Sequence, residues 1–214
     1  DWFNNSMIVT LGLIAVIGLV VFLIWEYTEK HPVVDIRIFR HRGFSISVLT
    51  LAFGFAAFFG SIVIIPQWLQ TNMSYNATWA GYLTAMMGFG SLTMSPIVAK
   101  LASKVDERLL ASFGFVLMSG VTLLRAFWNN EADFMALALP QIIQGFAVPF
   151  FFIPLSNLAL GSVLPHEIAS AAGLMNFVRT MAGAIGTSLA VTLWDDHSKV
   201  ARSEMVSNLH TDAT

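Results

Sequence analysis

Six long apolar stretches fill nearly the whole chain, and each is long enough to cross a lipid bilayer. A helical span needs about 20 apolar residues, because each residue rises about 1.5 Å through a hydrocarbon core about 30 Å thick. The stretches are Met7–Trp25, Phe44–Leu69, Trp79–Leu101, Leu109–Trp128, Phe134–Leu164 and Ala169–Trp194. The chain is therefore predicted to be an all-α membrane protein with six transmembrane helices. Its function has to be sought in the few polar groups at membrane depth.

Composition supports a membrane protein and argues against an enzyme. Hydrophobic residues make up 56% of the chain and charged residues 11%, whereas a soluble domain carries about 25% charged residues. The absence of cysteine excludes disulfides and cysteine metal sites. The spans hold no Ser–His pair and no His or Asp cluster with metal-ligand spacing, so we expect neither catalysis nor a metal site. Because the chain opens at Asp1 without an initiator methionine, we expect it to be a piece of a longer protein.

Basic residues are concentrated in two connections on one side of the membrane. They are Lys30, Arg37, Arg40 and Arg42 before the second span, and Lys100, Lys104 and Arg108 after the third. The connections Gln70–Thr78 and Asn129–Asp133 contain no Lys or Arg. The positive-inside rule thus places the basic side in the cytoplasm and the tail after Trp194 outside it. The run Ile36–Arg42 suits a short helix on the inner leaflet, where its cations either bind anionic lipid headgroups or only set the topology.

The sixth span carries an arginine deep in apolar surroundings. Asn176, Arg179, Gly183 and Gly186 stand at i, i+3, i+7 and i+10, so they share one helical face. A charged side chain at the centre of a span costs at least about 2.5–3.5 kcal/mol, and it persists only where it is paired or faces water. Arg179 is therefore either a cavity or gating charge, or a buried arginine bonded to carbonyls of a neighbouring helix.

Other spans offer amides and aromatic rings rather than acids. Gln141, Gln144 and Phe152 follow one stripe of the fifth span, where the amides could join helices or line a substrate path. The second span is rich in Phe, and its Ala52, Ala56 and Gly60 would let another helix approach closely. The core of no span contains Asp, Glu or His. A proton-driven pump needs a titratable group at membrane depth, so a proton carrier would have to lie outside this piece.

Several uncommon stretches carry a family resemblance over nearly the whole chain. They are DWFNNS, HPVVDIRIFRHRGF, IIPQWLQ, NATWAGYL, KVDERLL, PQIIQGFAVPFFFIPLSNLAL and LPHEIASAAGLMNFVRTMAGAIGTS. The chain resembles the second half of a major facilitator superfamily transporter, specifically the fourteen-span EmrB-type drug/proton antiporters of bacteria. The resemblance implies an inserted helix (1–26), a cytoplasmic loop (27–43), five of the six helices of the C-terminal bundle (44–194) and the start of a periplasmic segment (195–214).

Two family motifs are present in altered form. The loop Ala99–Arg108 resembles the superfamily's G-x-x-x-D-x-x-G-R-R loop and retains Lys104 and Arg108, while Asp106 replaces a usual glycine. The run from Gln141 to Gly145 resembles the R-x-x-Q-G of the first half, with Gln141 in place of the arginine linked to proton coupling. We interpret Lys104, Asp106 and Arg108 as a conformational loop. The second match supports proton coupling in the absent half.

The resemblance implies part of a multidrug efflux transporter of the bacterial inner membrane, working by alternating access and driven by the proton gradient without a cofactor. The candidate cavity or gate residues are Phe53, Phe58, Gln67, Gln141, Gln144, Phe152, Asn176 and Arg179. Implied partners are lipophilic small-molecule substrates, membrane lipids, the missing N-terminal half, a periplasmic adaptor and an outer-membrane channel, but no nucleic acid. A transporter of one metabolite and a non-transporting membrane sensor or scaffold remain alternatives. Helices interrupted by Gly and Pro, together with an arginine at the membrane midplane, favour a transporter over a scaffold.

Overall fold

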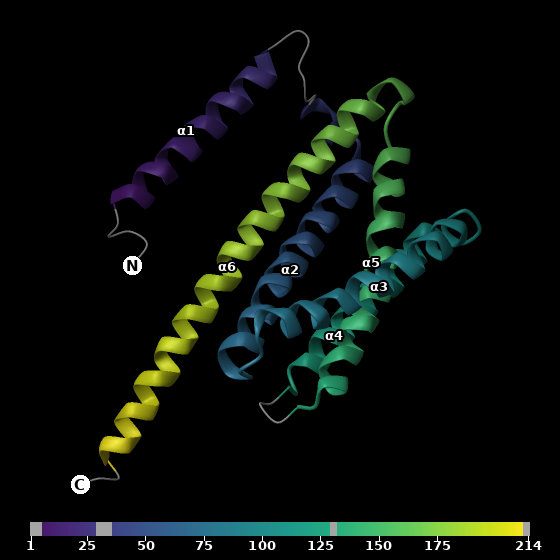
Figure 1. Ribbon diagram of the computed structural model, residues 1–214. Helices are drawn as coiled ribbons and strands as arrows, with labels where there is room; N and C mark the ends of the chain where they lie inside the picture. The colour runs from purple at the N-terminus through teal and green to yellow at the C-terminus, as the bar shows by residue number, and fades with distance from the viewer. Residues whose placement is uncertain (1–5, 29–35, 129–131, 212–214) are drawn as a thin grey trace.

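Six α-helices and two short 3-10 helices occur in the structure, a computed structural model that describes residues 6–28, 36–128 and 132–211 (Figure 1). The elements are α1 (Ser6–Thr28), η2 (Ile36–Arg40), α2 (Arg42–Asn72), α3 (Ala77–Ala102), α4 (Glu107–Arg125), α5 (Phe134–Gly161), η3 (Pro165–Glu167) and α6 (Ile168–Thr211), where η marks a 3-10 helix. All six α-helices contain a segment long and apolar enough to cross a membrane. The predicted all-α fold with six spans is confirmed. Lys30 and residues 129–131, which entered the topology prediction, lie outside the described residues.

Polar side chains fix where three of the helices begin. The Asn76 side chain accepts a hydrogen bond from Trp79 N at 2.8 Å, and Asp106 accepts one from Arg108 N at 2.9 Å. Asp133 accepts a hydrogen bond from Phe134 N, also at 2.9 Å. Such N-caps satisfy backbone donors that a helix leaves free at its first turn. They define the starts of α3, α4 and α5.

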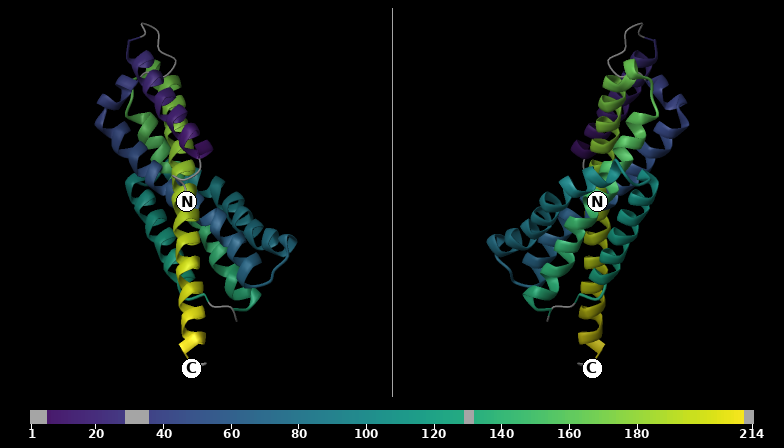
Figure 2. Two further views of the ribbon diagram at one scale, coloured as in Figure 1. Left: turned by 90° about the vertical axis from the view of Figure 1, so that its left-hand side faces the viewer. Right: turned by 90° about the vertical axis from the view of Figure 1, so that its right-hand side faces the viewer.

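The C-terminal ends of α4, α5 and α6 differ from the sequence prediction. α4 ends at Arg125, so Trp128 lies beyond the helix, and α5 ends at Gly161 rather than at Leu164. α6 continues without a break past Trp194 and reaches Thr211, a length of 44 residues. At 1.5 Å per residue α6 extends about 66 Å, well beyond the bilayer core. Figure 2 shows its C-terminal part protruding beyond the other helices.

The helices pack in two groups around α2 and α5. α6 lies along α2, while α5 contacts α3, α4 and also α2 (Figure 1). Glycine makes the closest crossings possible, because a Cβ built on Gly186 of α6 would overlap the backbone of Ala56 on α2. The predicted small-residue row of the second span therefore lies at a helix crossing. α1 is exposed at most of its described positions, although Glu26 near its C-terminal end is buried, and it lies beside α6, where the Phe22 and Phe177 rings are 5.7 Å apart.

Two apolar clusters lie toward opposite ends of the bundle. One includes Phe44, Leu51 and Phe151, and the fully buried Ile38 of η2 belongs to it. The predicted short helix at Ile36–Arg42 is thus present as η2, but it packs into the protein through Ile38 as well as presenting basic residues. The other cluster includes Leu69 and Leu137, and the stacked rings of Trp68 and Trp128 lie near it.

Candidate functional site

Phenylalanine rings from α2 and α5 meet in the middle of the bundle. We call Phe55, Phe58, Phe59 and Phe152 the phenylalanine cluster. The Phe152 ring lies 4.3 Å from that of Phe55 and 5.8 Å from that of Phe58, measured between centroids. Phe59 lies 5.7 Å from each of Phe55 and Phe58. The structure therefore brings the predicted residues Phe58 and Phe152 together, and it adds Phe55 and Phe59, which the site prediction did not include.

Arg179 lies on one side of this cluster. Its guanidinium carbon is 4.3 Å from the centroid of the Phe55 ring, within the range of a cation–π interaction. Arg179 Nε is buried and has no hydrogen-bond partner among the described residues. Among the described residues, Arg179 therefore does not form the hydrogen bonds to carbonyls of a neighbouring helix that one of the two predictions required. Aromatic stacking holds the side chain instead.

The Arg179 side chain faces an open groove between α2 and α6. The groove has a volume of about 460 Å³, and Phe55 and Phe59 form its aromatic wall. The opposite wall carries Asn176, Arg179 and Thr180 of α6. The predicted shared face of the sixth span is thus partly a groove lining and partly, at Gly186, a close contact with α2. One aromatic wall opposite a wall of amide, guanidinium and hydroxyl groups suits an amphipathic organic molecule.

A second arginine lies on the other side of the phenylalanine cluster, at the end of α4. Arg125 donates a hydrogen bond to Gln141 Oε1 at 2.6 Å, and its guanidinium carbon is 5.8 Å from the Trp128 ring centroid. Gln141 and Gln144 are 2% and 3% exposed, so both predicted amides are interior groups. Gln141 thus joins α5 to α4 through this hydrogen bond, which is one of the two roles predicted for the amides. Sequence reasoning missed Arg125 because it lies at a span end. Its signal was that, apart from Lys199 and Arg202 in the tail, it is the only Lys or Arg on the side predicted to lie outside the cytoplasm.

The remaining candidate cavity residues are Phe53 and Gln67, both on α2. Phe53 is 74% exposed and lines a second groove of about 620 Å³ between α2 and α4, whose lining also includes Phe58 and Gln144. Gln67 is nine residues beyond Phe58 on α2, which places it about 13 Å further along the helix axis. The structure thus places Phe53 in a groove shared with Phe58 and Gln144, and it does not bring Gln67 to the phenylalanine cluster.

The predicted conformational loop forms the turn between α3 and α4. Lys104 is exposed, Asp106 caps α4, and Arg108 lines the end of a groove of about 640 Å³ between α2 and α4. Asp106 thus has a local structural role that its place in the family motif did not suggest.

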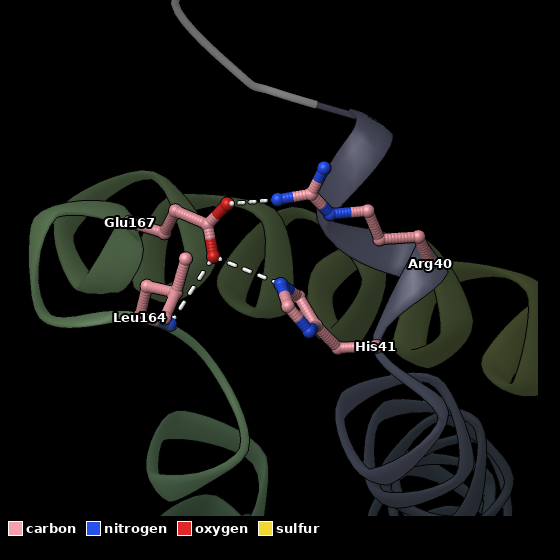
Figure 3. Close-up of polar contacts among 4 residues, drawn as sticks. All are labelled: Arg40, His41, Leu164 and Glu167. Atoms are coloured by element: carbon pink, nitrogen blue, oxygen red, sulfur yellow. Dashed lines mark hydrogen bonds and ion pairs between the residues drawn. The ribbon is translucent and has the colours of Figure 1, made fainter.

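A carboxylate that the sequence prediction did not single out joins the ends of α2 and α6 (Figure 3). Glu167 of η3 accepts hydrogen bonds from Arg40 at 3.1 Å and from the Leu164 backbone N–H at 3.1 Å. The Nε2 atom of the His41 ring lies 2.9 Å from the Glu167 Oε2 atom. The side chain of Glu167 is 10% exposed. The cluster fixes the turn between α5 and α6 against the start of α2.

The site contains groups for binding rather than for bond chemistry. No group of three or more His, Cys, Asp or Glu side chains that could hold a metal occurs among the residues that the structure describes. Around the phenylalanine cluster the polar groups are two guanidinium groups, amides and hydroxyls. Such groups orient a ligand by hydrogen bonding and charge, while the rings bind its apolar part.

The sequence is similar to those of known membrane transport proteins. A family model described as Major Facilitator Superfamily matches residues 2–187. The chain is 37% identical over 211 residues to the multidrug export protein EmrB of Escherichia coli K12, covering 98% of this chain and 41% of that protein. It is equally similar, over the same shares, to EmrB of Haemophilus influenzae. It is 34% identical to the fatty acid resistance protein FarB of Neisseria gonorrhoeae over 195 residues, 91% of this chain and 38% of that protein. The chain thus spans about two-fifths of the length of these curated relatives.

Proposed function

Because this chain belongs to the Major Facilitator Superfamily, of the EmrB type, we propose that it forms part of a multidrug efflux transporter. Its six candidate spans make it a multi-pass protein of the bacterial inner membrane. The names of its relatives, which include multidrug export and fatty acid resistance proteins, support export of lipophilic small molecules. We propose a transporter and not an enzyme, with lipophilic compounds as substrates.

The observation that carries the proposal is the placement of Arg179. It lies eleven residues into α6, about 16 Å along the helix, with its guanidinium on the Phe55 ring and facing the α2–α6 groove. A cation is retained at such depth when it serves a pathway or a ligand. In alternating access this groove would form one wall of a substrate site, and rocking of the bundle would expose it to either side.

We propose that the energy comes from the proton gradient and that no cofactor takes part. The predicted cores of the spans contain no Asp, Glu or His, and arginine does not titrate in a useful range. The proton-carrying residue would then lie on a segment outside this chain, namely the N-terminal half that the resemblance implies. A periplasmic adaptor and an outer-membrane channel are further proposed partners. The protruding end of α6, on the non-cytoplasmic side by the charge rule, points to the side where an adaptor would bind.

Substitution of Arg179 in the full-length protein tests the proposal. We expect Arg179→Ala to abolish drug resistance while the protein still inserts into the membrane, and Arg179→Lys to restore it only in part. Lysine keeps the charge but lacks the planar guanidinium that stacks on Phe55. Lys100→Ala, which removes an exposed charge at the end of α3, is the matched control. Normal resistance in Arg179→Ala at unchanged expression would rule out the site.

A further inference from the structure

Four helices line a very small cavity beside Arg125, with both polar and apolar side chains in its wall. The cavity has a volume of about 10 Å³. Each helix contributes polar side chains to its wall: Ser61 from α2, Thr84 from α3, Arg125 from α4, and Gln141 and Gln144 from α5. Apolar side chains, among them Phe58 and Met87, complete the lining.

Two atoms in this wall lack the partners that their burial demands. Arg125 Nε, a donor, and Gln144 Oε1, an acceptor, are both buried and form no hydrogen bond within the part of the chain that the structure describes. Gln144 as a whole is only 3% exposed. Leaving a donor or acceptor buried and unpaired is costly, so native interiors pair such groups with protein or with ordered water.

We propose that this cavity binds one structural water molecule. The water would accept a hydrogen bond from Arg125 Nε–H and donate one to Gln144 Oε1. Its second hydrogen would go to the oxygen of Ser61 or Thr84. Both hydroxyls already donate, Ser61 to Ala57 O at 3.0 Å and Thr84 to Ala80 O at 2.8 Å, which leaves their oxygens free to accept. Three hydrogen bonds are the usual number for a buried water.

The size of the cavity selects this ligand. About 10–15 Å³ is the least volume that holds a water, whereas small-molecule sites measure about 300 Å³ or more. The cavity is therefore not a part of the drug site that opens to substrate. Its water would join α4 and α5 to α2 or α3 through exchangeable hydrogen bonds. Such a water-mediated contact would stabilise one arrangement of the helices, and breaking it would cost little free energy when the helices move.

The first test is direct. In a cryo-EM map of the full-length protein that resolves ordered water, we expect a density peak within hydrogen-bonding distance of both Arg125 Nε and Gln144 Oε1. A map of that quality with an empty cavity, or with Gln144 bonded directly to Arg125 Nε, overturns the proposal.

The second test compares melting temperatures of purified variants. Gln144→Met has a similar size but no acceptor, so with water bound we expect Tm to fall by about 2 °C or more. In a dry cavity the same substitution removes an unpaired acceptor and should leave Tm unchanged or raise it, which would refute the proposal. Combining Ser61→Ala with Thr84→Val removes both candidate third partners, and we expect this double variant also to lower Tm.

A matched control distinguishes the effect of losing the water on Tm from the effect of losing the hydroxyls' own hydrogen bonds to the backbone. Ser112 and Thr122 also donate to the carbonyl four residues earlier, at 2.8 Å and 2.9 Å, but they are exposed. Ser112→Ala combined with Thr122→Val is therefore the control for the Ser61 and Thr84 pair. If the two double variants melt alike, the third hydrogen bond does not exist and the water is refuted.

Discussion

The crossing of α2 and α6 gives a prediction whose size follows from the geometry. A Cβ on Gly186 would have the O, Cα and C atoms of Ala56 as its nearest neighbours, with the C atom at 2.5 Å. Carbon atoms in contact lie about 3.5–4.0 Å apart, so the two helices would have to separate by about 1 Å. A backbone cannot rotate away as a flexible side chain can. Gly186→Ala should therefore destabilise the α2–α6 pair.

The expected cost is that of overpacking, about 1–3 kcal/mol. Gly173, on the same helix, is the control because a Cβ there would meet nothing within 4 Å. Both substitutions gain the same helix propensity, about 0.5–1 kcal/mol, when alanine replaces glycine. The difference between Gly186→Ala and Gly173→Ala therefore isolates the steric cost.

The assay is thermal unfolding of both variants in detergent, followed by size-exclusion chromatography. At about 2–4 °C per kcal/mol for a chain of this size, Gly186→Ala should melt about 2–12 °C below Gly173→Ala. Equal melting temperatures would show that α2 and α6 do not approach so closely. A Cβ on Gly60 would lie 2.9 Å from Ala190 Cβ. Gly60→Ala should therefore also lower the melting temperature, but by a smaller amount.

Three further predictions concern the ends of the helices. Since the chain has no cysteine, Asn72→Cys should react with an impermeant thiol reagent added outside cells, and Lys104→Cys should not; the reverse pattern would invert the topology. Asp106→Ala should cost about 1 kcal/mol in urea or thermal unfolding because it removes the N-cap of α4, whereas Asp106→Asn should keep most of the stability. Glu167→Gln, which loses the ion pair with Arg40 but keeps an acceptor, should lower Tm less than Glu167→Ala, and equal losses would contradict the hydrogen-bonded cluster.

The helices themselves could be predicted because their signal is local. An uninterrupted apolar run of span length is sufficient to predict a membrane helix. The first five predicted helices end within a few residues of the observed ends, and only the end of the last differs by more. α6 was predicted to stop at Trp194 because its apolar composition stops there. The helix continues to Thr211 since helix formation depends on backbone geometry and propensity, and not on lipid alone.

The candidate site could be predicted only in part, because its pairs join residues far apart in sequence. The helical spacing of the sixth span correctly placed Asn176 and Arg179 on one face. No periodicity could show that Arg125 reaches Gln141, or that Glu167 meets Arg40, which is 127 residues away. Such pairs depend on how whole helices cross, and the crossings are set by glycines whose partners lie on another helix.

The two arginines near the phenylalanine cluster differ in how their charge is stabilised, and this difference suggests different roles. Arg125 donates to the side-chain oxygen of Gln141, lies beside the Trp128 ring and, by our proposal, binds a water, so its partners lie within the bundle. Arg179 has a ring on one face, an open groove beside it, and no hydrogen bond within the described residues. A cation in that position still favours an anionic or hydrogen-bond-accepting group from outside its own bundle. Arg125 therefore suits a fixed joint between helices, while Arg179 suits a group that responds when a substrate or another bundle meets the α2–α6 groove.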